Sequence, residues 1–165
     1  SYYMADSELR TGNVVALFIV DKRAAPMKKV EHMNALAGQG IEGDRYFLGT
    51  GTYSKKPEPG RQVTLIKSET LESLKDKFDI TVKPEESRRN ILTQGIEIND
   101  LIGTEFFVGP VRLRAHRIPQ PCLYLEELLG QPGLYKELWD NGGISCEILS
   151  EGIIREGDII TTSPD

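Results

Sequence analysis

Short apolar and β-branched runs, separated by glycine and proline turns, constrain the fold of this chain most strongly. Such runs are typical of strands, and they recur along most of the sequence. The predicted strands cover residues 13–20, 30–36, 62–66, 90–93, 104–108, 111–116, 144–149 and 158–162. Residues 104–108 and 111–116 flank Gly109-Pro110 and predict a hairpin. Many short strands with few helices predict a β-rich α+β domain or a barrel.

A few helices are expected between these strands. The predicted helices begin at Ser68 and Pro84 and cover residues 122–129 and 135–139. Ser68 is expected to be the N-cap of the first helix. Leu71, Leu74 and Phe78 follow at helical spacing, so we expect them on its buried face.

Length and composition indicate one globular domain over residues 1–165. The chain has 39% hydrophobic and 27% charged residues, which are ordinary values for a globular protein. Residues 1–10 are expected to be a disordered or artificial N-terminus, with neither a signal peptide nor, elsewhere, a membrane-spanning run. The cytoplasm is therefore the expected location. A net charge of −5 gives no general attraction to nucleic acid or to acidic membranes.

The two cysteines, Cys122 and Cys146, are expected to be reduced thiols. Cys146 lies within an apolar strand and is predicted to be in the core. Cys122 follows Pro121 at the start of a predicted helix, where the helix dipole favours a thiolate. Two interpretations of Cys122 stay open, a buried structural thiol and a thiolate that acts as metal ligand or nucleophile, the latter with His116 as a conceivable base. Neither cysteine has zinc-site spacing.

Three basic or glycine-rich segments could bind an anion. They are Gly40 to Tyr46, Gly60-Arg61-Gln62 and Arg88-Arg89-Asn90. In the first segment Asp44 could orient the Arg45 guanidinium as an anion-binding fork. Each segment also has an ordinary explanation, as a surface ion pair, a strand start or a helix cap. From the residues alone both interpretations remain open.

Taken together and in this order, the segments resemble the MOSC domain, named for its place at the C-terminus of molybdenum-cofactor sulfurases. The resemblance rests on Ala25-Pro26-Met27, Gly40 to Tyr46, Gly51-Thr52-Tyr53-Ser54, Arg61 to Leu65, Arg88 to Ile91, Leu101-Ile102-Gly103, Pro121-Cys122, Gly142-Gly143 and Gly157-Asp158. It covers nearly the whole chain and is similar to the stand-alone bacterial type, without the pyridoxal-phosphate sulfurase domain of larger members. It implies a mainly β fold, a closed β-barrel of complex topology with small flanking helices.

The resemblance also implies a cofactor and a set of site residues. The cofactor is molybdenum cofactor, a pterin dithiolene with a phosphate, and Cys122 corresponds to the family cysteine that ligates molybdenum. The implied pterin- and phosphate-binding residues are Lys28, Arg45, Arg61, Gln62, Arg88 and Asn90. A soft thiolate suits molybdenum, and arginines suit a phosphate.

Related enzymes reduce N-hydroxylated bases and amidoximes by two electrons. The same activity here would break the N–O bond of a small N-hydroxylated substrate, with electrons from a separate redox protein and with His116 and Asp44 as candidate proton-relay residues. Two alternatives stay open: a carrier that holds the cofactor or a sulfur atom on Cys122, and a regulatory domain with a vestigial pocket. Nothing in the sequence fixes the oligomeric state.

Overall fold

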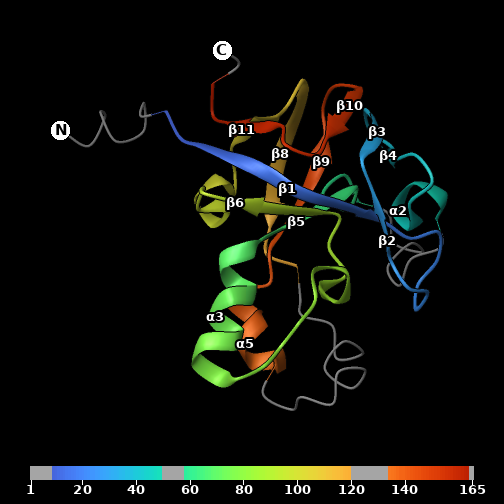
Figure 1. Cartoon of the computed structure of the whole chain (residues 1–165). Helices are drawn as coiled ribbons and strands as arrows, with labels where there is room; N and C mark the ends of the chain where they lie inside the picture. The colour runs from blue at the N-terminus through green and yellow to red at the C-terminus, as the bar shows by residue number, and fades with distance from the viewer. Residues whose placement is uncertain (1–8, 50–57, 120–133, 164–165) are drawn as a thin grey trace.

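The computed structural model describes residues 9–49, 58–119 and 134–163 (Figure 1). Its strands are β1 (Thr11–Ile19), β2 (Lys28–Val30), β3 (His32–Leu36), β4 (Gly40–Ile41), β5 (Val63–Lys67), β6 (Ile91–Gln94), β7 (Glu105–Val108), β8 (Val111–Arg117), β9 (Ile144–Ile148), β10 (Gly152–Arg155) and β11 (Ile159–Thr161). Its helices are α2 (Arg45–Leu48), α3 (Ser68–Phe78) and α5 (Leu134–Asn141), with 3-10 turns η1 (Pro84–Ser87) and η2 (Ile98–Leu101). None of these helices is long and apolar enough to cross a membrane.

A closed barrel forms the centre of the molecule. The strands β1, β11, β7, β8, β9, β5 and β6 are hydrogen-bonded in this order, and the pairing of β11 with β1 closes the circle of seven. Only the β5–β6 pair of the barrel is parallel, and α3 makes the crossover between them. The predicted mainly β fold with a closed barrel and small helices is confirmed.

The barrel interior is packed with apolar side chains from the described strands. Its largest fully buried members include Phe106, Leu17, Leu65, Ile91, Leu113 and Ile144. Cys146 lies among them with no exposed surface, as predicted, and its thiol is free. A second, smaller core joins α3 to α5 through Leu74 and Leu138, and the two helices lie side by side below the barrel (Figure 1). Among the described residues, the cavity described below lies outside this core.

Two features of the strand prediction were wrong. The single predicted strand over 30–36 is broken at Glu31, because Lys28–Val30 pairs with β1 whereas His32–Leu36 pairs with β10 and β4 in a separate sheet. Gly152–Arg155 was not predicted, since its glycine-containing flanks are typical of turns, yet it forms β10 along the edge of β3. The predicted hairpin around Gly109-Pro110 is confirmed.

The helix predictions differ from the structure in detail. Lys67, and not Ser68, is the N-cap of α3; Ser68 is already helical and its hydroxyl contacts Glu69. Leu74 is buried as predicted, but Phe78 is half exposed because the helix ends there and Asp79 turns into the left-handed region. The predicted helix over 135–139 corresponds to α5, and the predicted helix over 122–129 lies outside the described residues.

Candidate functional site

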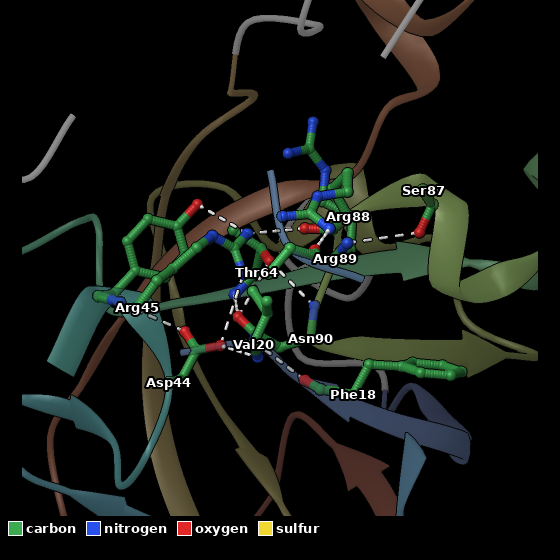
Figure 2. Close-up of polar contacts among 11 residues, drawn as sticks. Phe18, Val20, Asp44, Arg45, Thr64, Ser87, Arg88, Arg89 and Asn90 are labelled. Atoms are coloured by element: carbon green, nitrogen blue, oxygen red, sulfur yellow. Dashed lines mark hydrogen bonds and ion pairs between the residues drawn. The ribbon is translucent and has the colours of Figure 1, made fainter. Parts of the chain in front are cut away.

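Asn90, which directly precedes β6, is hydrogen-bonded to β1 and β5 in the barrel wall. Its side-chain oxygen accepts hydrogen bonds from the backbone nitrogen of Thr64 at 3.0 Å and from the Thr64 hydroxyl at 3.1 Å. Its side-chain nitrogen donates to the Phe18 carbonyl at 3.1 Å (Figure 2). Asn90 has no exposed surface, so these bonds satisfy both ends of a buried amide. The network fixes the start of β6 against β1 and β5.

Asp44 and Arg45 form a buried ion pair at the start of α2. Asp44 is the N-cap; its carboxylate accepts from the backbone nitrogens of Val20 at 3.1 Å and Tyr46 at 3.4 Å. The Arg45 guanidinium donates to Asp44 Oδ1 at 3.4 Å. Burial raises the pKa of Asp44, against the opposing effects of the Arg45 charge and of these backbone hydrogen bonds. The predicted orientation of Arg45 by Asp44 is thus present, but inside the protein.

Arg45 also connects α2 to the loop before β6. Its Nη2 donates to the Arg88 carbonyl at 2.8 Å and to the Tyr46 hydroxyl at 3.3 Å (Figure 2). The guanidinium carbon lies 4.4 Å from the centroid of the Tyr46 ring, a cation–π distance. Arg45 therefore fixes the position of the Tyr46 ring. Tyr46 also lines the cavity described below, so it connects this network to the cavity.

Arg88 and Arg89 fasten the loop between η1 and β6 to two other loops. Arg88 has a left-handed backbone, and its Nη1 donates to the Ala25 carbonyl. Arg89 Nε donates to the Gly142 carbonyl at the end of α5 at 2.7 Å. Both arginines are half-buried, so they contribute positive charge on this side while they hold loops together.

A cavity of about 410 Å³ opens outside the barrel, next to α2. It is lined by Gly38, Gln39, Tyr46, Phe47, Leu48, Gly49, Glu58, Pro59, Arg61 and Gln62. The Gln62 side-chain oxygen is fixed by the backbone nitrogen of Ile148 at 2.8 Å, and Arg61 contacts Glu58 at 3.7 Å. The cavity thus combines aromatic walls with the guanidinium and amide groups of two predicted site residues.

His116 lies beside this cavity, at the end of β8. Its Nε2 is 2.9 Å from Glu147 Oε1 on β9, a contact that orients the ring. Gly60 packs on the other side, and a Cβ at this position would lie 2.8 Å from His116 Cβ and Cγ. A glycine is therefore required where the chain passes the imidazole and leads into β5.

The structure brings most of the predicted site residues into two neighbouring groups. Arg45, Arg88 and Asn90 belong to the buried network around Asp44, whereas Arg61 and Gln62 line the cavity, and Tyr46 belongs to both. Lys28 is exposed on β2 opposite Ile19 and does not line the cavity. Cys122 lies outside the described residues. In the described part of the chain, no cluster of three or more His, Cys, Asp or Glu side chains could hold a metal ion.

Sequence reasoning missed Glu58 and Arg117 as neighbours of the cavity. Arg117 Nη2 lies 3.0 Å from Glu58 Oε2. Strict alternation along β8 would put Arg117 on the apolar face with Val111, Leu113 and Ala115. The strand pattern therefore predicts the wrong side of the strand for this residue. The predicted strand over 111–116 ends before Arg117, and no local pattern indicates that the following residue lies on the outer face.

These features define a class: a closed β-barrel with a packed interior and a polar ligand pocket on its outer wall. Residues 42–161 match the family model of the MOSC domain, and the chain belongs to this family. The family is associated with molybdenum cofactor, which makes this a molybdenum-cofactor-related domain. No curated protein matches the chain in sequence.

Solved structures of low sequence identity share the fold. The YuaD protein from Bacillus subtilis superposes with a TM-score of 0.74 at 21% identity, covering 93% of this chain and 96% of that chain. YiiM from Geobacillus stearothermophilus gives 0.70 at 14% identity, with 92% and 75% covered. YiiM from Escherichia coli gives 0.63 at 16% identity, with 90% and 69% covered. At these identities the similarity extends to the fold only.

Proposed function

We propose that this protein binds molybdenum cofactor, with the Cys122 thiolate as metal ligand, and reduces small N-hydroxylated compounds by two electrons. The observation that carries the proposal is the cavity beside α2 in a MOSC domain, which two residues predicted to contact the cofactor, Arg61 and Gln62, line together. Its volume of about 410 Å³ is within the range of small-molecule and cofactor pockets.

The side chains of the cavity have the chemistry that an anionic heterocycle requires. Arg61 offers a guanidinium for a phosphate, Gln62 an amide for the edge of a pterin, and Tyr46 an aromatic face and a hydroxyl. Arg45 supports Tyr46 from behind, and Asn90 supports the start of β6. We therefore assign ligand contact to Arg61 and Gln62 and a positioning role to Arg45 and Asn90. Lys28 and Arg88 remain predicted contributors of positive charge to the approach.

The proposed reaction balances with two electrons and two protons. The N–O bond of the substrate breaks, one proton completes the water that carries away the oxygen, and the second proton goes to the nitrogen, so that the amine or amidine is the product. Bound molybdenum cofactor supplies this two-electron reduction. Cys122 anchors and tunes the metal and does not attack the substrate, and an external redox protein returns the electrons. His116, oriented by Glu147, is the candidate for holding a proton near the cavity.

The test is turnover by protein made in a host that synthesises molybdenum cofactor. Wild type and Cys122→Ala are compared for reduction of a simple N-hydroxylated base with an artificial electron donor, and Cys146→Ala serves as the matched control because Cys146 is in the barrel core. We expect turnover by wild type and Cys146→Ala and none by Cys122→Ala. Bound metal without turnover in wild type would contradict the reductase proposal and favour the cofactor carrier.

A further inference from the structure

The end of β8 contains a β-bulge that changes the side on which Arg117 lies. Ala115 is opposite Cys146 in the barrel core, but Arg117 is opposite Ser145, so the register shifts by one residue between Ala115 and Arg117. A regular strand would continue the inward series of Val111, Leu113 and Ala115 to Arg117. The extra residue in the bulge turns Arg117 to the outer face, as bulges commonly do beside functional sites.

On the outer face Arg117 shares a carboxylate with Arg61. Glu58 Oε2 lies 3.0 Å from Arg117 Nη2, and Glu58 Oε1 lies 3.7 Å from Arg61 Nη2. Glu58 and Arg61 line the cavity, so this group of three lies at its edge. The side chains of Arg61, Arg117 and Glu58 are 23%, 38% and 46% exposed. Ion pairs this open to water are weak and can be exchanged by an incoming anion.

We propose that Arg61 and Arg117 form a binding subsite for a phosphate group at the edge of the cavity, and that Glu58 is its resident counter-ion, which the phosphate displaces. A phosphate offers more negative charge and more acceptor oxygens than one carboxylate, and guanidinium groups bind it in a bidentate manner. That the natural ligand is the phosphate of the pterin rests on the proposed function. The capacity of Arg61 and Arg117 to bind a phosphate group does not depend on it. It adds Arg117 to the recognition surface and makes Glu58 a competitor that lowers the affinity for weakly charged ligands.

The test is a titration of the full-length protein with inorganic phosphate at constant ionic strength, using material from a host unable to make molybdenum cofactor. Binding is followed by calorimetry and by the NMR signals of the arginine side chains. Because Glu58 competes with the anion, Glu58→Gln is expected to bind phosphate about five-fold more tightly than wild type, a factor typical of one exposed ion pair. Arg117→Gln is expected to bind about five-fold less tightly.

Arg112→Gln is the matched control. Arg112 is an exposed arginine of the same strand, but it pairs with Glu105 away from the cavity, so its loss should leave phosphate binding unchanged. Arg117→Lys keeps the charge but loses the bidentate guanidinium, so its affinity for phosphate should lie between those of wild type and Arg117→Gln. If Arg117→Gln does not fold, a lower affinity of Arg117→Lys than of wild type tests the role of Arg117 in its place.

Three results would overturn the inference: no phosphate binding by wild type, unchanged affinity in Glu58→Gln, or equal losses in Arg112→Gln and Arg117→Gln. The titration involves no molybdenum. If the protein does not load molybdenum, the proposed function is refuted and the phosphate subsite is unaffected. If the protein does not bind phosphate, the subsite is refuted, whereas molybdenum binding by Cys122 and turnover are still tested by their own experiment.

Discussion

At the scale of single residues, the buried pair of Asp44 and Arg45 determines how the loop side of the site is held. The Asp44 carboxylate accepts from two backbone nitrogens and from a guanidinium, and the guanidinium continues to the Arg88 carbonyl and to Tyr46. Burying one charge alone is costly, whereas a paired and hydrogen-bonded charge is tolerated. The position of Tyr46 at the cavity therefore depends on a carboxylate that itself does not line it.

Asp44→Ala removes the carboxylate acceptor of this network and should lower the free energy of unfolding by about 3 kcal/mol, because it leaves the buried Arg45 guanidinium without its counter-charge and two backbone N–H groups without an acceptor. Denaturant unfolding of the two proteins measures the difference. Asp76→Ala, at an exposed position of α3, is the control and should change stability by less than about 0.5 kcal/mol. Equal effects of the two substitutions would contradict the structural role of Asp44.

The same carboxyl predicts a pH dependence of stability. Because burial raises the pKa of Asp44 above its ordinary value of 3.8, the native state binds this proton more tightly than the unfolded state does. The contribution of Asp44 to stability is therefore fully present below that ordinary value and decreases as pH rises through the native pKa. The stability difference between wild type and Asp44→Ala should therefore shrink as the pH rises from below 3.8 through the raised native pKa. A difference that grows with pH would mean that the Arg45 charge outweighs burial.

The residue types in the sequence predicted which side chains belong to this network, but they did not predict the partners of those side chains. Asp44 beside Arg45 does form an ion pair, as the adjacent charges suggested. The sequence could not show that Arg45 and Asn90 are turned inward, because both have partners distant in sequence. Arg45 donates to the Arg88 carbonyl, and Asn90 bonds to Phe18 and Thr64. Local patterns contain no information about such long-range satisfaction of buried polar groups.

At the scale of elements, a glycine controls how closely the segment between α5 and β9 approaches strand β5. Gly143, between α5 and β9, has a φ of +106°, and a Cβ there would overlap the Leu65 carbonyl oxygen of β5. This close approach places β9 beside β5, where Ser145 and Thr64 pair beneath the site. Gly143 is thus a packing requirement of the barrel wall.

Gly143→Ala is expected to combine two costs, about 1–2 kcal/mol for the left-handed backbone and a further 1–3 kcal/mol for the overlap with β5. Gly157→Ala separates them, because Gly157 has a φ of +89° and nothing within 4 Å of an added Cβ. Thermal or denaturant unfolding should show the first variant clearly less stable than the second. Comparable losses would mean that β9 can move away from β5 without penalty.

Elements formed by local contacts were predictable, and those defined by distant partners were not. The β7–β8 hairpin follows from two apolar runs around one turn. The bulge at the end of β8 is invisible in the sequence because its register is set by β9, and β10 exists only because β3 offers an edge. For this reason the outward position of Arg117, beside Glu58, could not be predicted.

At the scale of the whole molecule, closure of the barrel decides where chemistry can occur. The pairing of Thr11 to Asn13 with Ile159 to Thr161 joins the two ends of the described chain and leaves an interior filled with apolar side chains. The many short strands predicted a barrel or a β-rich α+β domain, and the family resemblance predicted that the barrel is closed. The order of strands around the barrel is non-local and could not be read from periodicity.

We propose that Cys122 ligates the molybdenum of the cofactor, and the most direct test is the molybdenum content per chain. Wild type, Cys122→Ala and Cys146→Ala are purified from a host that makes molybdenum cofactor and compared by elemental analysis at equal protein concentration. We predict near-stoichiometric metal in wild type and Cys146→Ala, and a large loss in Cys122→Ala. Equal metal in all three proteins, or none in wild type, would contradict the claim.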